Sequence, residues 1–341
     1  MANTGVLLNR ARAKAPSVLS IVDRGGTGHV ASYYQSARLA DSKDDPVNKP
    51  ISYAAAQVLR VLPRTTISRV AGRAAEFLWP GALRDVVLNA YCKAYNVDLS
   101  EAAASRDTYD SFDAFFTRAL KAGARPIHAD ANVAVSPADG QVASFGEIDA
   151  ESTFVVKGRP YRLVELLGDA SEAERFQGGR GCVVYLSPRD YHRVHVPCEG
   201  VLSRVNSLPG DYFPVNEFGV KHIPQLFIRN RRVACFVDTP EHGRVAIILV
   251  AAMVVGRISV LGIDERDVPV GEWPMGKEVA RGDELGRFHL GSTAVVLFEA
   301  KAGVEWVMPE GPIRMGEPLA RLRRATEFKK NTASTSRRRR S

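Results

Sequence analysis

Apolar positions between residues 51 and 97 recur at the three- and four-residue spacing of an α-helix. A first apolar face comprises Ile67, Val70, Ala71, Ala74 and Leu78, with Arg69 and Arg73 on another face. A second repeat, almost uninterrupted, comprises Leu83, Val86, Val87, Ala90, Tyr91, Ala94 and Val97. Pro63 and Pro80 interrupt these patterns, because proline lacks the N–H that a helix interior needs. The region therefore predicts at least three amphipathic helices.

From about residue 131 the pattern changes to short β-branched runs separated by turn residues. The predicted strands are Val133–Val135, Gln141–Phe145, Thr153–Val156, Cys182–Leu186, Val194–Val196, Val201–Val205, Arg232–Val237, Val245–Val255 and Thr293–Phe298. Many short strands without alternating helices favour antiparallel pairing. We therefore predict an α+β fold, in which N-terminal amphipathic helices precede a predominantly antiparallel β-sandwich or barrel-like body.

Four regions follow from these patterns. Residues 1–50 show no sustained period and predict a poorly ordered leader. Residues 51–130 are predicted to be helical, residues 131–320 form the β-rich body, and residues 321–341 form a basic tail. The tail carries nine Lys or Arg and one Glu, which accounts for the whole net charge of +8. The basic balance therefore does not indicate a nucleic-acid-binding domain face.

Targeting and metal patterns are absent from the sequence. The four cysteines, Cys92, Cys182, Cys198 and Cys235, have no CxxC spacing, so we expect reduced thiols and no metal. Arg10, Arg12 and Lys14 interrupt any signal-peptide core. The longest apolar run, residues 245–255, is too short to span a bilayer. We expect a protein of the cytosol or of a membrane surface.

Four segments carry candidate chemistry. Ser136–Gly140 places Asp139 in a turn between two strands, and Asp190–Pro197 contains His192 and His195, the only HxxH pair. Three-residue spacing in extended chain points two rings to opposite faces, so a shared metal is not expected. Leu290–Thr293 contains the only Gly-Ser dipeptide, and Phe112–Arg118 reads as an aromatic-packed helix. Taken alone, the first, third and fourth segments are better explained as an ordinary turn, a strand entry and a packing element. A lone histidine is more often structural, but a pair flanked by Pro188 and Pro197 is less easily explained in that way.

Taken in this order, the segments resemble the bacterial phosphatidylserine decarboxylases, which are self-cleaving and pyruvoyl-dependent. The resemblance extends over residues 51–322. It includes Tyr185–Cys198 (YLSPRDYHRVHVPC), Pro209–Asp211 (PGD), Val215-Asn216 and Leu285–Thr293 (LGRFHLGST). Residues 1–50 and the tail beyond Arg324 contribute nothing to it.

The resemblance implies a mechanism. Ser292 attacks the carbonyl of Gly291, with His195 as the base and Asp139 as the acid that orients His195. A serine hydroxyl is a weak nucleophile until an oriented base takes its proton. Cleavage between Gly291 and Ser292 converts Ser292 into a pyruvoyl group, the pyruvate cofactor. This group forms a Schiff base with phosphatidylserine and accepts the electrons released with CO2, giving phosphatidylethanolamine. His192 then acts as general acid. Fragments 1–291 and 292–341 are expected to stay associated.

A lipid substrate also implies contact with a membrane. We expect residues 51–130 to face it and residues 131–320 to be catalytic, on the cytoplasmic side of the cell membrane. Basic side chains beside an apolar helix face favour anionic headgroups, and the candidates are Arg60, Arg64, Arg69 and Arg73. Three alternatives stay open: a relative acting on a soluble amine, with helices that only cap the sheet; a non-catalytic β-sandwich module; and a nucleic-acid binder acting through its tail.

Overall fold

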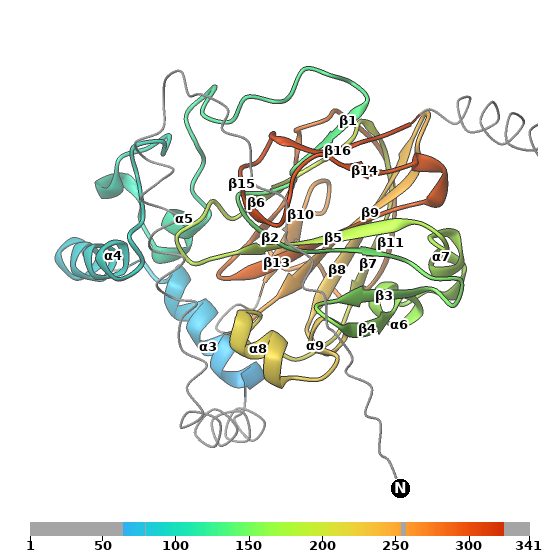
Figure 1. Cartoon of the computed structure of the whole chain (residues 1–341). Helices are drawn as coiled ribbons and strands as arrows, with labels where there is room; N and C mark the ends of the chain where they lie inside the picture. Colours follow the sequence, from blue (N-terminus) through green and yellow to red (C-terminus); the bar gives the residue numbers. More distant parts are fainter. Residues whose placement is uncertain (1–63, 79, 254–256, 324–341) are drawn as a thin grey trace, which may run out of the picture. The chain divides into compact units, whose positions relative to one another are not determined.

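An eight-stranded antiparallel sheet forms the centre of the computed structural model (Figure 1). The structure describes residues 64–78, 80–253 and 257–323, so the predicted leader and most of the predicted tail lie outside the described residues. The strand order is β11-β7-β8-β9-β13-β5-β2-β15. The strands are β2 (Gly140–Glu147), β5 (Arg180–Leu186), β7 (Gly200–Leu208), β8 (Arg232–Thr239), β9 (Gly243–Ala251), β11 (Gly271–Val279), β13 (Ser292–Phe298) and β15 (Gly311–Ile313).

Smaller sheets and short helices surround the central sheet. One three-stranded sheet has the order β1-β16-β14, the other β10-β12-β6, and β3 and β4 form a hairpin. Their bounds are β1 (Val133–Val135), β3 (Thr153–Val156), β4 (Arg159–Arg162), β6 (Arg193–His195), β10 (Ile258–Val260), β12 (Glu284–Phe288), β14 (Glu305–Trp306) and β16 (Pro318–Arg321). The helices within this body are α6 (Leu163–Leu167), α7 (Ala170–Arg175), α8 (Glu217–His222), α9 (Leu226–Arg229) and the 3-10 turn η3 (Ala300–Ala302).

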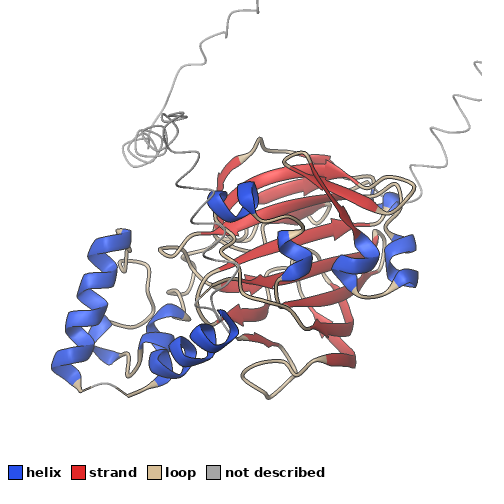
Figure 2. Cartoon of the chain, turned by 90° about the horizontal axis from the view of Figure 1, so that it is seen from below, coloured by secondary structure: helices blue, strands red, loops and turns tan. Residues whose placement is uncertain are grey.

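The middle strands of the central sheet are buried on both faces. Successive side chains of a strand point to opposite faces, and each face has its own apolar cluster. In β13, Val296 belongs to one apolar cluster, together with Val194 of β6 and Phe288 of β12. Val295 belongs to another, together with Phe154 of β3 and residues of α6 and α9. All seven residues of β13 are buried. One face is thus covered by strands and the other by a hairpin and short helices, some of which lie across the strands in Figure 2.

The predicted β-rich body is confirmed. Each of the nine predicted strands corresponds to a strand of the structure, namely β1, β2, β3, β5, β6, β7, β8, β9 and β13. The run predicted over 245–255 ends as a strand at Ala251, and residues 254–256 lie outside the described residues. Antiparallel pairing is confirmed throughout the sheets, whereas the central sheet stays open rather than closing into a barrel in the part of the chain that is described.

Two of the helices predicted between residues 51 and 97 are present, α3 (Arg64–Glu76) and α4 (Gly81–Tyr95), and the part before residue 64 lies outside the described residues. The predicted aromatic helix is α5 (Phe112–Phe116), and the short turn η2 (Arg106–Thr108) lies between α4 and α5. Figure 1 shows α3, α4 and α5 at one end of the central sheet. Pro80 precedes α4, and Asn96, with a φ of 52°, ends it. None of the described helices is long and apolar enough to cross a membrane.

Much of the predicted apolar surface of α3 and α4 faces outward. Val70 is 60% exposed, Leu83 48% and Val86 63%, whereas α3 buries Ser68 and Ala75 instead. Of the four predicted headgroup arginines, Arg73 is exposed. Arg60 and the side chains of Arg64 and Arg69 lie outside what the structure describes.

Candidate active site

Ser292 opens β13, the strand between β9 and β5, where it is paired with Ala251 and Leu186. Its side chain is buried, and its Oγ has no hydrogen-bond partner within the described structure. The two residues before it have positive φ, 96° at Leu290 and 50° at Gly291. Glycine adopts this region freely, but a leucine there costs roughly 1–3 kcal/mol. An unpartnered hydroxyl therefore follows directly on a strained backbone.

A cavity of about 520 Å³ opens beside Ser292. Its walls come from α3, α4, α5 and the end of the central sheet, and none of the lining residues carries a charged side chain. They are Ala71, Ala74, Ala75, Val87, Tyr91, Tyr95, Phe112, Phe116, Tyr185, Leu186, Pro188, Pro214, Val215, Asn216, Ala252, Met253, Leu290, Gly291 and Ser292. Its apolar walls suit an aliphatic ligand, and the buried Ser292 forms part of them.

His195 is fixed as a neutral base. Its Nδ1 lies 2.8 Å from the carbonyl of Gly282, which can only accept, so Nδ1 carries the proton. Nε2 is therefore an acceptor, and the phenol of Tyr191 donates to it at 3.1 Å. Burial lowers the pKa of His195, partly opposed by the bond to Gly282. At neutral pH the ring is uncharged, and its basic nitrogen is Nε2, which accepts from Tyr191.

His192 is more deeply buried than His195. Its Nδ1 donates to the carbonyl of Asp190 at 2.8 Å, its ring lies 4.0 Å from that of Phe116, and its Nε2 has no partner in the described chain. Burial lowers the pKa of His192 to about 3. The carbonyl of Asp190 also accepts a bond from the buried Arg118, which ties α5 to this turn. The two histidines thus have separate surroundings, as their spacing predicts.

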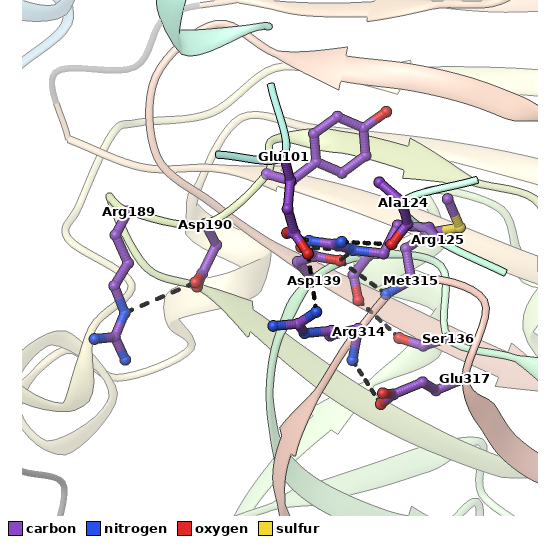
Figure 3. Close-up of polar contacts among 12 residues, drawn as sticks. Glu101, Ala124, Arg125, Ser136, Asp139, Arg189, Asp190, Arg314, Met315 and Glu317 are labelled. Atoms are coloured by element: carbon purple, nitrogen blue, oxygen red, sulfur yellow. Dashed lines mark hydrogen bonds and ion pairs between the residues drawn. The ribbon is translucent and has the colours of Figure 1, made fainter. Parts of the chain in front are cut away.

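Asp139 is held by groups other than His195 (Figure 3). Arg125 donates to its two oxygens, through Nε to Oδ1 at 2.9 Å and through Nη2 to Oδ2 at 2.5 Å. The backbone N–H of Met315 donates to Oδ1 at 2.9 Å. Arg125 is also paired with Glu101 at 2.8 Å. The contact to His195 is through the backbone, because the N–H of His195 donates to the carbonyl of Pro137 at 2.7 Å.

The structure brings the predicted site segments to one end of the central sheet. Ser292 is level with Leu186 of β5, and Gln141 of β2 is level with the preceding Tyr185, so Asp139 lies two strands away from Ser292. Two strand spacings are about 10 Å. Phe288, four residues before Ser292, donates its N–H to the carbonyl of His192. The described side chains do not, however, form a hydrogen-bonded Asp139–His195–Ser292 chain. The described residues also contain no group of three or more His, Cys, Asp or Glu arranged for a metal.

Two polar residues of the site are missing from the predicted set, Tyr191 and Arg125. Tyr191 stands in the same motif as the histidines, and burial raises its pKa to about 12, so it stays a proton donor. Arg125 lies beyond the segment Phe112–Arg118, which the sequence indicates only as a packing element. Adjacency to a histidine pair could have indicated Tyr191, but the partner of Arg125 is fixed by the fold.

Comparison with known proteins is consistent with this arrangement. The sequence profile described as phosphatidylserine decarboxylase matches residues 112–321. The phosphatidylserine decarboxylase proenzyme of Shewanella sp. strain MR-4 is 41% identical over 278 residues, which is 77% of this chain and 94% of the relative. The proenzyme of the same name from Shewanella putrefaciens strain CN-32 is 41% identical over 279 residues, 77% of this chain and 95% of the relative. The chain therefore belongs to the phosphatidylserine decarboxylase family of enzymes.

Proposed function

We propose that this protein decarboxylates phosphatidylserine to phosphatidylethanolamine after cleaving itself between Gly291 and Ser292. The observation that carries the proposal is the buried, unpartnered hydroxyl of Ser292 on the wall of an apolar cavity, directly after the left-handed Leu290 and Gly291. A hydroxyl in this position has no structural bond to lose when it reacts. Membership of the family supplies the substrate class.

In the cleavage step His195 takes the proton of the Ser292 hydroxyl at Nε2, and Oγ attacks the carbonyl carbon of Gly291. The C–N bond between the two residues breaks, and the released nitrogen takes the proton. The ester that results breaks by elimination, in which a base takes the Cα proton of residue 292, the Cβ–O bond breaks and Gly291 keeps the oxygen as a free carboxylate. The enamine left at residue 292 becomes an imine when a proton moves to Cβ. Water then replaces the nitrogen of residue 292, which leaves as ammonia. The fixed tautomer of His195 supports its role, because it leaves Nε2 as the basic atom.

Asp139 supports His195 indirectly in this proposal. The ion pair with Arg125 and the bond from Met315 hold the turn that ends at Asp139. That turn presents the carbonyl of Pro137 to the N–H of His195. The Asp139 charge also raises the pKa of His195, which burial otherwise lowers, and so favours the protonated base. We therefore assign Asp139 a positioning and electrostatic role.

Decarboxylation follows at the same place. The pyruvoyl group, once formed from Ser292, supplies a ketone that accepts the substrate amine and the electron pair left by CO2. The apolar walls from α3, α4 and α5 hold the substrate and exclude water. His192 delivers a proton to the carbon that has lost CO2. Its Nε2 has no other partner in the described chain and can carry this proton, which it must first take up because burial lowers its pKa to about 3.

The two fragments stay together in this proposal. Cleavage leaves β13 at the start of the second fragment, and all seven residues of that strand are buried between β9 and β5. Removing such a strand exposes the core on both faces of the sheet, so fragments 1–291 and 292–341 are expected to copurify as a heterodimer.

We further propose that α3 and α4 lie on the membrane. Phe77 is 64% exposed and Leu78 70%, and Val70 and Val86 are exposed to a similar degree. Helices α3 and α4 also form walls of the cavity beside Ser292. Exposed apolar groups beside a lipid-sized cavity favour interfacial binding. Replacing Phe77 and Val86 together by Ser should release the protein from phosphatidylserine vesicles in a flotation assay. The matched control is Val155→Ser on β3, 44% exposed, which should bind as before; equal loss in both would contradict this surface.

The activity is tested with purified full-length protein and phosphatidylserine in detergent, following release of CO2 and gel mobility together. Ser292→Ala and His195→Ala should remain uncleaved and inactive. His192→Ala should cleave and yet decarboxylate poorly. His128→Ala, a histidine outside the site, should behave as the unchanged protein. Cleavage of the Ser292→Ala variant at the same bond, or absence of activity in a fully cleaved unchanged protein, would refute the proposed function.

A further inference from the structure

A second cavity, of about 440 Å³, lies against α3. It shares this helix with the active-site cavity but uses different residues, Ser68, Arg73 and Glu76 instead of Ala71, Ala74 and Ala75. The helix therefore has an apolar wall toward Ser292 and a polar wall toward the second cavity. Nothing in the proposed cleavage or decarboxylation uses the polar wall.

Three arginines from three separate segments line this second cavity. Arg73 comes from α3, Arg231 directly precedes β8 and Arg257 directly precedes β10. The lining contains two carboxylates, Glu76 and Asp267, so it carries one positive charge in excess. A ligand with a single negative charge would balance this excess.

Both carboxylates already have partners, which leaves one arginine uncommitted. Glu76 is paired with Arg257 and also accepts from Arg266 at 3.0 Å. Asp267 is paired with Arg231 at 3.4 Å. The guanidinium of Arg73, in contrast, has no ion pair or hydrogen bond to another described residue, and the residue is exposed. Its guanidinium is therefore the donor best placed to meet an incoming anion.

Two details show that the wall is arranged for a polar ligand. Ser68 is fully buried, lines the cavity, and its Oγ has no partner in the described structure. An unpaired buried hydroxyl costs about 1–3 kcal/mol unless a ligand satisfies it. At Gly72 a Cβ atom would lie 3.0 Å from Nη2 of Arg257, so only glycine lets that guanidinium lie against the helix without a shift. Ser68 and Gly72 thus bring a hydroxyl and a guanidinium to one wall.

The exposed surface next to Arg73 indicates what the anion is attached to. Val70, Arg73 and Phe77 follow at three- and four-residue spacing and share one side of α3, since the N–H of Phe77 still bonds to the carbonyl of Arg73 at 3.2 Å. Val70 and Phe77 are 60% and 64% exposed. An anion at Arg73 with apolar chains along these side chains matches a phospholipid.

We propose that this cavity binds the phosphodiester group of a membrane phospholipid other than the substrate molecule at Ser292. Phosphodiesters carry one negative charge, which matches the excess charge of the lining, and they accept bonds from arginine and hydroxyl groups. The identity of the ligand as a lipid rests on the proposed membrane function, whereas the charge and donor arrangement do not. Such a site anchors α3, and with it one wall of the active-site cavity, to the bilayer surface.

The test uses full-length protein with Ser292→Ala, which can neither cleave nor decarboxylate. Dihexanoyl-phosphatidylglycerol, kept below its critical micelle concentration, is titrated by calorimetry. It carries a phosphodiester and no amine. Arg73→Gln should weaken binding about tenfold. Ser68→Ala should weaken binding several-fold while leaving the ligand-free protein at least as stable. Arg162→Gln, which removes an exposed arginine of β4 outside the cavity, should bind as the parent does.

Inorganic phosphate is titrated in parallel to separate the two possible sources of the anion. Binding of the lipid with loss in Arg73→Gln and Ser68→Ala supports the proposal. If only free phosphate binds with this dependence, the assignment to a lipid is wrong. No lipid binding, or lipid binding unchanged in both variants, overturns the site. Since the measurement is made on an inactive variant, its failure leaves the proposed decarboxylation untouched.

Discussion

Replacing Arg125 or Asp139 tests whether the ion pair between them positions His195. The pair is well buried, with side-chain exposures of 7% for Arg125 and 11% for Asp139. Arg125→Gln leaves the Asp139 carboxylate with the single N–H of Met315. Removing one partner of a buried pair costs roughly 3–5 kcal/mol. Asp139→Asn leaves Arg125 paired with Glu101, so the loss of charge-assisted bonds should cost only about 1.5–3 kcal/mol.

Stability is measured by urea unfolding in the Ser292→Ala background, where the chain stays intact. The double variant should be less destabilised than the two single changes added together, because it removes both charges and leaves no buried Asp139 carboxylate without its ion-pair partner. The control is Arg180→Gln, which breaks a pair with Glu147 whose side chains are 39% and 78% exposed. This control should cost at most about 1 kcal/mol.

Cleavage is then followed by gel in chains that retain Ser292. These measurements are made without urea, at a temperature where each variant is folded. Both Arg125→Gln and Asp139→Asn should slow cleavage to a similar extent, because either change loosens the turn whose Pro137 carbonyl holds His195. If Asp139→Asn abolishes cleavage while Arg125→Gln cleaves at the unchanged rate, Asp139 acts directly on His195 and the positioning role is refuted.

Three further outcomes follow from the site. Burial lowers the pKa of His192 to about 3, so the stability contributed by the neutral ring is complete above the ordinary histidine pKa and is lost as pH falls below it. In the Ser292→Ala background, the free energy of unfolding in urea should therefore fall by roughly 2 kcal/mol less for His192→Asn than for its parent between pH 7 and pH 5; equal decreases would contradict this. Because burial also lowers the pKa of His195, the cleavage rate should rise with pH only below about pH 6.5 and be flat above it; a rate still climbing above neutral pH would show another base. Leu290→Ala should cleave several-fold faster than Leu290→Gly, since both lose the side chain but only alanine keeps the left-handed strain, worth about 1 kcal/mol. Equal rates by gel would mean that strain does not assist the reaction.

The elements that could be predicted from the sequence are those whose buried residues form a continuous run or a regular repeat along the chain. β9 and β13 are apolar on both faces, so their runs are visible without any partner. β11 is missed because it is an edge strand with mostly exposed residues and no apolar run. α9 is missed because its four residues are too few to show a helical period.

The candidate site follows the same division. Motifs indicated Asp139, His192, His195 and Ser292, and the fold brings their segments to one end of the sheet. The sequence patterns did not indicate which groups distant in sequence would form hydrogen bonds or line the same cavity. Asp139 bonds to the N–H of Met315, 176 residues away, and the cavity walls come from helices whose alanines look like ordinary helix formers. Such partners depend on how the layers pack.

Intact-mass analysis of the purified full-length protein shows whether Ser292 becomes a pyruvoyl group by self-cleavage. Self-cleavage predicts two copurifying fragments, residues 1–291 and 292–341, the second lighter by one ammonia than a chain that begins with serine. Borohydride should then reduce its terminal ketone and add two hydrogen atoms to its mass. A decarboxylase that is active as a single uncleaved chain, or a second fragment that begins with an intact serine, would refute self-cleavage as the source of the activity.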